Sequence, residues 1–477
     1  MISKPNRVSG PGCLGACTYR WLSRIETTGK SKAEGSDAVV IGQIGQIADS
    51  PAKPVQLCMF SAELTPSDTF KRTARYVDDP PGYLRDSLGV DTFEARKALL
   101  CLPETVDMDR YGGGKHRQMF ERHIARLLGK QHGLFFITGV QAQLAALKIH
   151  AERAQKRRLA WHVSSHLETA EERAFETLYG LERILLGNDP QALPTVNEIK
   201  DDLALPAEER PAAILVETPN RVLGCQTYTF AELQAISAAC RNAGVMFHCD
   251  GARLWEIEPY YNAAAGKSFA DLAALFDTVY LSFYKGMGGV TGAMLVSNDE
   301  GLINEAKTWQ RRAGGTAFTF GYEIIDDERG FNENIGTFAR KRDKMMEIVD
   351  GIKEATARYK GAHDRPIVTF LPDRPTCCQI LTVFQGFTDD ELTAARDRVQ
   401  EKSNVRVFER LRRKEAVEES TTLSHATAAS AREDATEIER HFMEWMMMSV
   451  TEKIETSVFV NAYVDLCQEL LLVATPK

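Results

Sequence analysis

FHCDGARLW, residues 247–255, begins with a β-prone pair and then places an aspartate, a glycine and an arginine before a large aromatic residue. About thirty residues further on, VYLSFYKGMGGV (279–290) places Lys285 at the end of a second apolar, strand-like segment. Asp250 and Arg253 therefore stand at one predicted strand end and Lys285 at another. These side chains can meet if both strands belong to one sheet.

The chain around these stretches alternates between short apolar runs and helix-length amphipathic runs. Helices are predicted at residues 117–130, 140–155, 166–185 and 229–244, the last with a capping box. Strands are predicted at residues 133–139, 160–165, 212–218, 245–250, 277–283 and 292–297. Strands that are apolar throughout and alternate with helices are typical of a mostly parallel sheet with helices on both faces, an α/β fold. Ligands of such sheets bind beyond the carboxyl ends of the strands, where Asp250, Lys285 and the turn at Thr138–Gly139 are expected.

The pattern changes after about residue 335. One long helix is predicted at 334–359, followed by short β-like runs at 366–372, 377–385 and 405–411. We therefore expect a large α/β domain over residues 56–330 and a smaller α+β domain over 331–477.

Two further segments are unlike the rest of the chain. The region near 412–440 is rich in charge, Ser, Thr and Ala and predicts a solvated insertion. Residues 1–55 are rich in Gly and Ser, which predicts a disordered extension. A mitochondrial transit peptide is the alternative interpretation of this extension.

The composition excludes several classes of protein. A net charge of -8, with interspersed Lys, Arg, Asp and Glu, argues against a nucleic-acid partner. The chain has no run of eighteen apolar residues, so we expect no membrane span. Ten cysteines without regular spacing are typical of reduced thiols in a cytoplasmic protein. The pairs Cys13/Cys17 and Cys377/Cys378 lack zinc-site spacing, so no metal is predicted.

Lys285 and Asp250 together indicate one kind of cofactor chemistry. A lysine at a buried strand end has a lowered pKa and attacks carbonyl groups readily. Pyridoxal 5′-phosphate needs such a lysine for its aldehyde and usually an aspartate for its ring nitrogen. Taken singly, Lys285 is also consistent with a strand-end lysine whose amine reaches solvent, and Asp250 with a helix N-cap.

The same cofactor needs a phosphate site and a flat group over its ring. ITGVQAQ (137–143) is a predicted strand-to-helix turn, and backbone N–H groups at a helix start bind phosphate. His166 follows a predicted strand and could cover the ring. The alternatives are an ordinary glycine-containing turn and a polar residue at a helix start.

A series of motifs, in order along the chain, resembles the threonine aldolase and β-eliminating lyase family of fold-type I pyridoxal-phosphate enzymes. The resemblance covers residues 105–330 well and the C-terminal region in outline. The motifs are DRYGGG (109–114), LLGK (127–130), ITGVQAQ, HLETAE (166–171), ETPNRVLGCQ (217–226), HCDGARLW (248–255), YKGMGG (284–289) and RRAGG (311–315).

The resemblance implies a role for each matching residue of the cofactor site. Lys285 would bind the cofactor aldehyde, Asp250 would pair with the pyridine nitrogen, and His166 would stack on the ring. Arg253 would lie by the ring's phenolic oxygen or the substrate carboxylate. The phosphate would be held by Thr138, Gly139 and the backbone at Val140.

The resemblance also implies substrate-binding residues and an oligomer. Tyr111 and Arg312 would line the substrate site, from the same or a neighbouring subunit. Enzymes of this family work as homodimers or homotetramers.

The chain departs from the family pattern at several positions. Val140 stands where a hydroxyl residue is usual, and Tyr284 where a serine commonly precedes the lysine. ETPNR replaces a stretch whose histidine acts at the β-hydroxyl, and places Asn220 or Arg221 there. The late arginine that grips the substrate carboxylate has no clear counterpart. Arg221 could take that role by a bidentate contact, or could be a surface turn residue.

We expect a lyase that cleaves the Cα–Cβ bond of a β-hydroxy-α-amino acid, with His166 or a water it holds as the base. The alternatives are an amino-acid racemase or a β-eliminating lyase, with Tyr111 or Tyr284 as a second acid or base, and a non-catalytic relative. A nucleotide-binding loop at YGGGK (111–115) is disfavoured because no Ser or Thr follows Lys115.

Overall fold

The structure is a computed structural model of the 477-residue chain, and it describes residues 53–59, 65–103, 105–361, 364–413 and 440–473. The described residues belong to one compact unit that begins at Lys53. Most of the predicted N-terminal extension (1–52) and most of the predicted insertion (414–439) lie outside these ranges. Among the described residues, no helix has the length and apolar composition that crossing a membrane requires.

The largest sheet has seven strands in the order β2-β8-β7-β6-β5-β3-β4. The strands are β2 (His132–Phe136), β3 (Arg158–His162), β4 (Glu182–Leu186), β5 (Ala213–Glu217), β6 (Met246–Gly251), β7 (Thr278–Ser282) and β8 (Ala293–Ser297). The run from β7 to β4 is parallel, and β8 is antiparallel to both of its neighbours. The predicted, mostly parallel α/β sheet is therefore confirmed.

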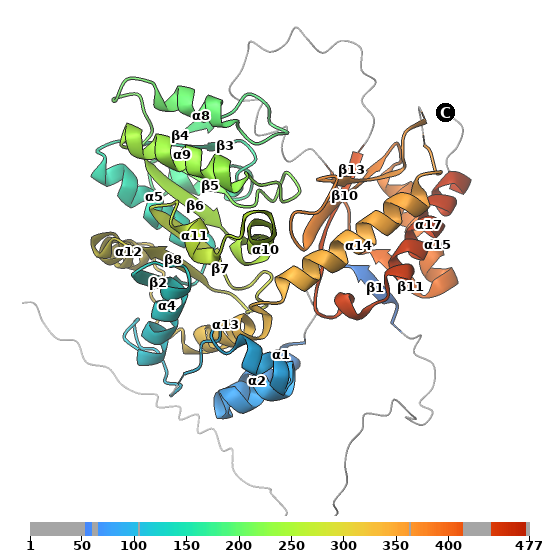
Figure 1. Cartoon of the computed structure of the whole chain (residues 1–477), viewed down its shortest axis with the longest axis horizontal. Coiled ribbons are helices and arrows are strands. Elements are labelled where there is room, and N and C mark those ends of the chain that lie inside the picture. Colours follow the sequence, from blue (N-terminus) through green and yellow to red (C-terminus); the bar gives the residue numbers. More distant parts are fainter. Residues whose placement is uncertain (1–52, 60–64, 104, 362–363, 414–439, 474–477) are drawn as a thin grey trace, which may run out of the picture. The chain divides into compact units, whose positions relative to one another are not determined.

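Helices cover both faces of this sheet (Figure 1), as the apolar strands predict. They are α4 (Lys115–Leu127), α5 (Gly139–Arg153), α8 (Val196–Leu203), α9 (Phe230–Ala243), α10 (Leu254–Ala265), α11 (Phe269–Ala273), α12 (Glu300–Arg312) and α13 (Gly321–Asn334). Residues of α5 and α12 pack with Phe136 of β2 on one face. Residues of α4 and α9 pack with Phe135 on the other. The capping box predicted for α9 is present at Thr229 and Glu232.

The prediction of one helix over residues 166–185 is wrong. The segment forms two short helices, α6 (His166–Thr169) and α7 (Ala174–Thr177), and then strand β4. Glu172 and Arg173 have φ angles of 46° and 55°, which are incompatible with a continuous right-handed helix. The end of the segment pairs in parallel with β3, so sheet extension outweighs its helical pattern.

The C-terminal region contains an antiparallel four-stranded sheet in the order β12-β13-β10-β9. The elements of this C-terminal region, inside and outside the sheet, are α14 (Phe338–Thr356), β9 (Val368–Leu371), β10 (Gln379–Gln385), α15 (Asp389–Ser403), β11 (Val405–Phe408), β12 (Arg412–Arg413), β13 (Arg440–Met446), η2 (Thr451–Lys453) and α17 (Thr456–Val473). The predicted strands near 366–372, 377–385 and 405–411 are confirmed. The helix predicted at 334–359 begins four residues late, because Gly336 has a φ of 77° between α13 and α14.

Two N-terminal features have no counterpart in the sequence-based prediction. Strand β1 (Val55–Cys58) pairs in parallel with β11, so Val55 is part of the folded unit. Helices α1 (Pro66–Asp78) and α2 (Pro80–Leu88) pack beside α13, and α3 (Val90–Arg96) packs against α2. The domain boundary near residue 330 stays a prediction.

Candidate active site

The carboxyl ends of β5, β6 and β7 bring three ionisable side chains to one edge of the sheet. Glu217 ends β5 and pairs in register with Asp250 of β6. Asp250 pairs in turn with Tyr280 of β7, and Lys285 follows that strand by three residues. Asp250 and Lys285 therefore belong to neighbouring strand ends, as the sequence predicts.

Lys285 lies in the loop between β7 and β8. Burial, followed by the nearby charge of Arg253, lowers the pKa of its amine to about 8. The next residue is a glycine for a packing reason, because a Cβ at Gly286 would lie 2.4 Å from Glu256 Oε1. The Gly286 N–H donates to that oxygen at 2.9 Å. Glu256 thereby fixes the backbone that carries Lys285.

Asp250 is 1% exposed and its Oδ1 accepts the Ala252 N–H at 3.0 Å. Its neighbour Glu217 is also buried. Burial and the charge of Asp250 both raise the pKa of the Glu217 carboxyl. Sequence reasoning missed Glu217, although its position at the end of an apolar strand is the same signal that identified Asp250.

His166 begins α6, and its N–H donates to Glu217 Oε2 at 3.2 Å. Its ring Nδ1 lies 2.9 Å from Glu171 Oε1. Burial lowers the pKa of His166, but the hydrogen bond to Glu171 and the charges of Asp250 and Glu217 outweigh burial and raise it. The ring therefore lies within the electrostatic reach of Asp250 and Lys285.

The predicted phosphate turn begins helix α5. Thr138 is the N-cap, and its hydroxyl accepts the Gln141 N–H at 3.3 Å. A Cβ at Gly139 would lie 1.9 Å from the Tyr280 hydroxyl oxygen, so only glycine fits. The Val140 side chain packs against an apolar cluster, so only the backbone of Val140 is available to a ligand at the turn. The first N–H groups of a helix lack intrahelical acceptors and suit an anion.

A buried polar network joins the two predicted arginines to the C-terminal sheet. Arg221 binds Glu444 of β13 with two contacts, Nε–Oε1 at 2.8 Å and Nη2–Oε2 at 2.9 Å. Arg253 donates from Nε to Gln379 Oε1 at 2.6 Å, and its Nη2 lies 3.7 Å from Glu444 Oε1. Gln379 also donates to Glu444 Oε1, at 2.7 Å. The bidentate contact of Arg221 is therefore made to a protein carboxylate.

The structure does not bring Tyr111 and Arg312 to Lys285 within the described part of one chain. Tyr111 is 65% exposed, and its ring contacts Phe318 edge-on, with ring centroids 5.5 Å apart. Arg312 stacks over Trp309, 4.9 Å from the ring centroid. Their place in a substrate site stays a prediction.

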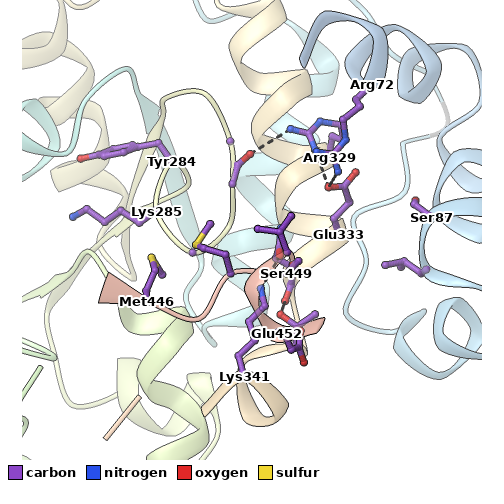
Figure 2. A pocket seen from close by; sticks show the side chains of 18 of the residues that line it. Arg72, Ser87, Tyr284, Lys285, Arg329, Glu333, Lys341, Met446, Ser449 and Glu452 are labelled. Atoms are coloured by element: carbon purple, nitrogen blue, oxygen red, sulfur yellow. Dashed lines mark hydrogen bonds and ion pairs between the residues drawn. The ribbon is translucent and has the colours of Figure 1, made fainter. Parts of the chain in front are cut away.

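A cavity of about 700 Å³ begins at Lys285 and Tyr284. Figure 2 shows these two residues at one end and Arg72, Arg329 and Glu333 at the other. The cavity is lined by the loop after β7, by helices α1 to α3, by α13 and α14, and by the chain after β13. A volume of this size is in the range of small-molecule sites.

The family model described as β-eliminating lyase matches residues 84–440, about three quarters of the chain. The chain belongs to the β-eliminating lyase family. The predicted family is thereby confirmed.

Two relatives illustrate what this β-eliminating lyase family member is similar to. The low specificity L-threonine aldolase of Saccharomyces cerevisiae is 26% identical over 255 residues, 50% of this chain and 61% of that protein. The crystal structure of a candidate L-allo-threonine aldolase from Listeria monocytogenes EGD-E is 29% identical, with a TM-score of 0.64. It covers 82% of this chain and 99% of that one. The chain aligns with 48–61% of the length of the first three curated relatives.

More distant structures show the fold alone. A lysine-to-alanine variant of serine palmitoyltransferase from S. paucimobilis with a bound PLP–myriocin aldimine is 12% identical, with a TM-score of 0.56. The match covers 88% of this chain and 89% of that one. The predicted fold-type I architecture is confirmed by these matches.

Proposed function

We propose that the chain is a pyridoxal-phosphate-dependent lyase that cleaves the Cα–Cβ bond of a β-hydroxy-α-amino acid. The single observation that carries the proposal is the buried Lys285 amine beside Asp250, in a member of the β-eliminating lyase family. The names of the aldolase relatives support the choice of reaction.

The residues present fit the cofactor. Lys285 offers a buried amine that can react with the cofactor aldehyde. Asp250, a residue that is 1% exposed, offers a carboxylate that can pair with the ring nitrogen of the cofactor. Thr138, Gly139 and the backbone at Val140 offer a helix N-terminus for its phosphate. The absence of a side chain at Gly139 lets the backbone of this turn lie close to Tyr280. When bound, pyridoxal phosphate supplies an electron sink for the pair left on Cα.

The chain's own residues then handle the protons. The β-hydroxyl loses its proton as the Cα–Cβ bond breaks, the aldehyde leaves, and Cα gains a proton to give glycine or a substituted glycine. His166 is the proposed base, directly or through a water, with Glu171 holding its Nδ1 and leaving Nε2 for the proton. Glu217 holds the His166 backbone and so positions the ring.

The test is release of acetaldehyde and glycine from L-threonine and L-allo-threonine by protein purified with pyridoxal phosphate. Aldehyde is measured by coupled reduction, and glycine by amino-acid analysis. Release of both products in equal amounts is the expected result. Binding of the cofactor without aldehyde release from any β-hydroxy-α-amino acid would overturn the proposed reaction.

Elimination or racemisation is the second candidate, favoured by one observation. The exposed Tyr284 places its ring centroid 5.5 Å from the Lys285 amine, so a second proton-carrying group adjoins the lysine. Ammonia and pyruvate from L-serine, or D-alanine from L-alanine, would identify these reactions.

We also propose a homodimer or homotetramer. The exposed side chains of Tyr111, Phe318 and Tyr322 support it, since a second subunit would cover them. Such a contact would let Tyr111 and Arg312 serve a neighbouring site. The compartment stays a prediction.

The uptake of pyridoxal phosphate by the apoprotein is expected to depend on pH. Only the neutral amine attacks an aldehyde, and a lysine with a pKa of about 8 is about one-tenth neutral at pH 7. Because the pKa is lowered, the uptake rate should rise nearly tenfold per pH unit below 8 and level off above it. Stopped-flow absorbance measures this rate, and a midpoint near 10 would contradict the burial of Lys285.

A further inference from the structure

Two polar residues of the C-terminal sheet, Gln379 and Glu444, lie buried beside the loops that carry the candidate active site. Gln379 begins β10 and Glu444 of β13 lies opposite Leu381, so the two side chains are diagonal neighbours on one face of the antiparallel pair. Gln379 is 1% exposed, and the side chain of Glu444 is 3% exposed. Buried polar groups need hydrogen-bond partners, and these two find theirs on residues of the large sheet's loops.

Gln379 connects Arg253 with Glu444. Its Oε1 accepts from Arg253 Nε at 2.6 Å, and its Nε2 donates to Glu444 Oε1 at 2.7 Å. A side-chain amide has one accepting and one donating end, so these two contacts fix its orientation. A guanidinium is planar, and a hydrogen bond at Nε sets the plane in which its other N–H groups lie. Gln379 therefore determines which way the Arg253 guanidinium faces.

Arg221 makes the stronger contact with Glu444. Its Nε and Nη2 bind the two carboxylate oxygens at 2.8 and 2.9 Å, whereas Arg253 Nη2 lies 3.7 Å from Glu444 Oε1. Bidentate arginine–carboxylate pairs are the stronger kind. Glu444 thus has its bidentate partner in Arg221, and Arg253 approaches the carboxylate less closely.

Arg253 is the arginine whose charge acts on Lys285. After burial, this charge is the second cause that lowers the pKa of the Lys285 amine. Arg253 is 2% exposed and follows Asp250 by three residues. The amine and the carboxylate of an α-amino acid are bonded to the same carbon, so a substrate held by its amine at Lys285 brings its carboxylate to the surroundings of that lysine. Arg221, the other candidate for the carboxylate, has two of its nitrogens on Glu444.

We propose that Gln379 is a positioning residue that holds the Arg253 guanidinium for the carboxylate of the amino-acid substrate, and that Arg221 supports it by keeping Glu444 from drawing Arg253 away. This inference rests on the proposed function, because it describes how the same site recognises its substrate. It gives the carboxylate contact to Arg253 and a supporting role to Arg221.

Gln379→Leu tests the amide. The measurement is isothermal titration of the holoprotein with glycine and with glycinamide, which has the same amine and no carboxylate. Glycine binding should weaken about 10- to 100-fold in Gln379→Leu, and glycinamide binding less than about 2-fold, because glycine alone of the two presents a carboxylate to Arg253. An equal loss for both ligands, or no loss for glycine, would overturn the inference. If Gln379→Leu does not fold, Gln379→Met removes the same two contacts and is read in the same way.

The Arg221–Glu444 pair allows a rescue experiment. Arg221→Gln leaves Glu444 charged, so Arg253 should move toward that carboxylate and glycine should bind about 10-fold more weakly. Adding Glu444→Gln removes the charge but keeps an oxygen that can accept from Gln379. The double variant should therefore regain most of the lost affinity. If the ion pair had a structural role alone, the double variant would bind glycine no better than Arg221→Gln, and the inference would be wrong.

Arg398→Gln is the matched control. Arg398 Nε lies 2.6 Å from Glu469 Oε2, a contact between α15 and α17. The substitution removes an arginine from another ion pair of the C-terminal region, with a glutamate side chain that is 5% exposed. It should change the binding of neither ligand. A loss of glycine affinity equal to that of Arg221→Gln would show a general effect of weakened ion pairs in this region and would contradict the inference.

The apoprotein gives a readout that needs neither substrate nor turnover. In Arg221→Gln the charge of Glu444 would offset the charge of Arg253, which lowers the pKa of Lys285 in the native protein. The Lys285 pKa should therefore rise, and the pH midpoint of cofactor uptake should move above about 8. Adding Glu444→Gln should return the midpoint to the native value. An unchanged midpoint in Arg221→Gln would contradict the movement of Arg253.

These readouts keep the inference distinct from the proposed reaction. If Gln379→Leu weakens glycine but not glycinamide, and no β-hydroxy-α-amino acid is cleaved by the native protein, the reaction is wrong and the positioning role stands. If threonine is cleaved and Gln379→Leu weakens both ligands equally, the positioning role is wrong and the reaction stands.

Discussion

Lys285→Ala is expected to lose the visible absorption band that pyridoxal phosphate gives in the native protein, and to cleave threonine at least about 1,000-fold more slowly. Lys285 is the strand-end amine whose pKa burial lowers to about 8, so it reacts with an aldehyde at neutral pH. Borohydride reduction followed by peptide mass spectrometry should place one phosphopyridoxyl group on Lys285. This readout does not depend on turnover.

Two comparisons make the result specific. Lys285→Arg keeps a positive charge in the same place but cannot form the bond, so it should lose the band as completely as the alanine variant. Lys341 is a second buried lysine of the same cavity whose pKa burial also lowers. A label on Lys341 in the native protein, with none on Lys285, would contradict the assignment.

The positions of Asp250 and Lys285 at strand ends could be predicted because the sequence pattern that marks a strand end is local. An apolar run that ends in a polar residue identifies a buried strand and its carboxyl end together, and this places Asp250 and Lys285 at one sheet edge. Glu217 carries the same signal at the end of β5 and could have been identified in the same way. Its role became visible only with the register that pairs it with Asp250.

The partners from the C-terminal sheet could not be predicted. Glu444 reaches Arg221 and Arg253 because β13 pairs with β10, with Glu444 opposite Leu381. No local pattern connects these distant segments, and register between strands depends on packing of the whole sheet. The sequence left open which group Arg221 binds, and the structure supplies a protein carboxylate.

The helix predicted at 166–185 failed for a related reason. Its residues have helical spacing, but the edge of the parallel sheet offers β4 a full set of backbone partners on β3. The two residues of positive φ, Glu172 and Arg173, turn the chain toward that edge. The break also leaves His166 at the start of a short helix, where Glu217 holds its backbone.

Asp250→Asn is expected to lower kcat for cleavage about 100- to 1,000-fold while the absorption band remains. The substitution keeps an oxygen that can accept the Ala252 N–H, so the strand end should keep its geometry. It removes the negative charge that would hold a ring nitrogen protonated, and electrostatic contacts of this kind contribute rate factors of about this size. Steady-state kinetics of aldehyde release, with the spectrum of the bound cofactor, measure both effects.

The same variant has electrostatic consequences that do not require turnover. The charge of Asp250 raises the pKa of His166, so the His166 pKa should fall in Asp250→Asn, as an NMR titration can follow. Asp277→Asn is the matched control, because Asp277 Oδ2 accepts the Phe247 N–H at 2.7 Å at the opposite end of the same strands. It removes an equal charge directly before β7 and should change neither kcat nor the His166 pKa. If both variants lowered kcat equally, Asp250 would act on the stability of the sheet, and its place opposite a ring nitrogen would be wrong.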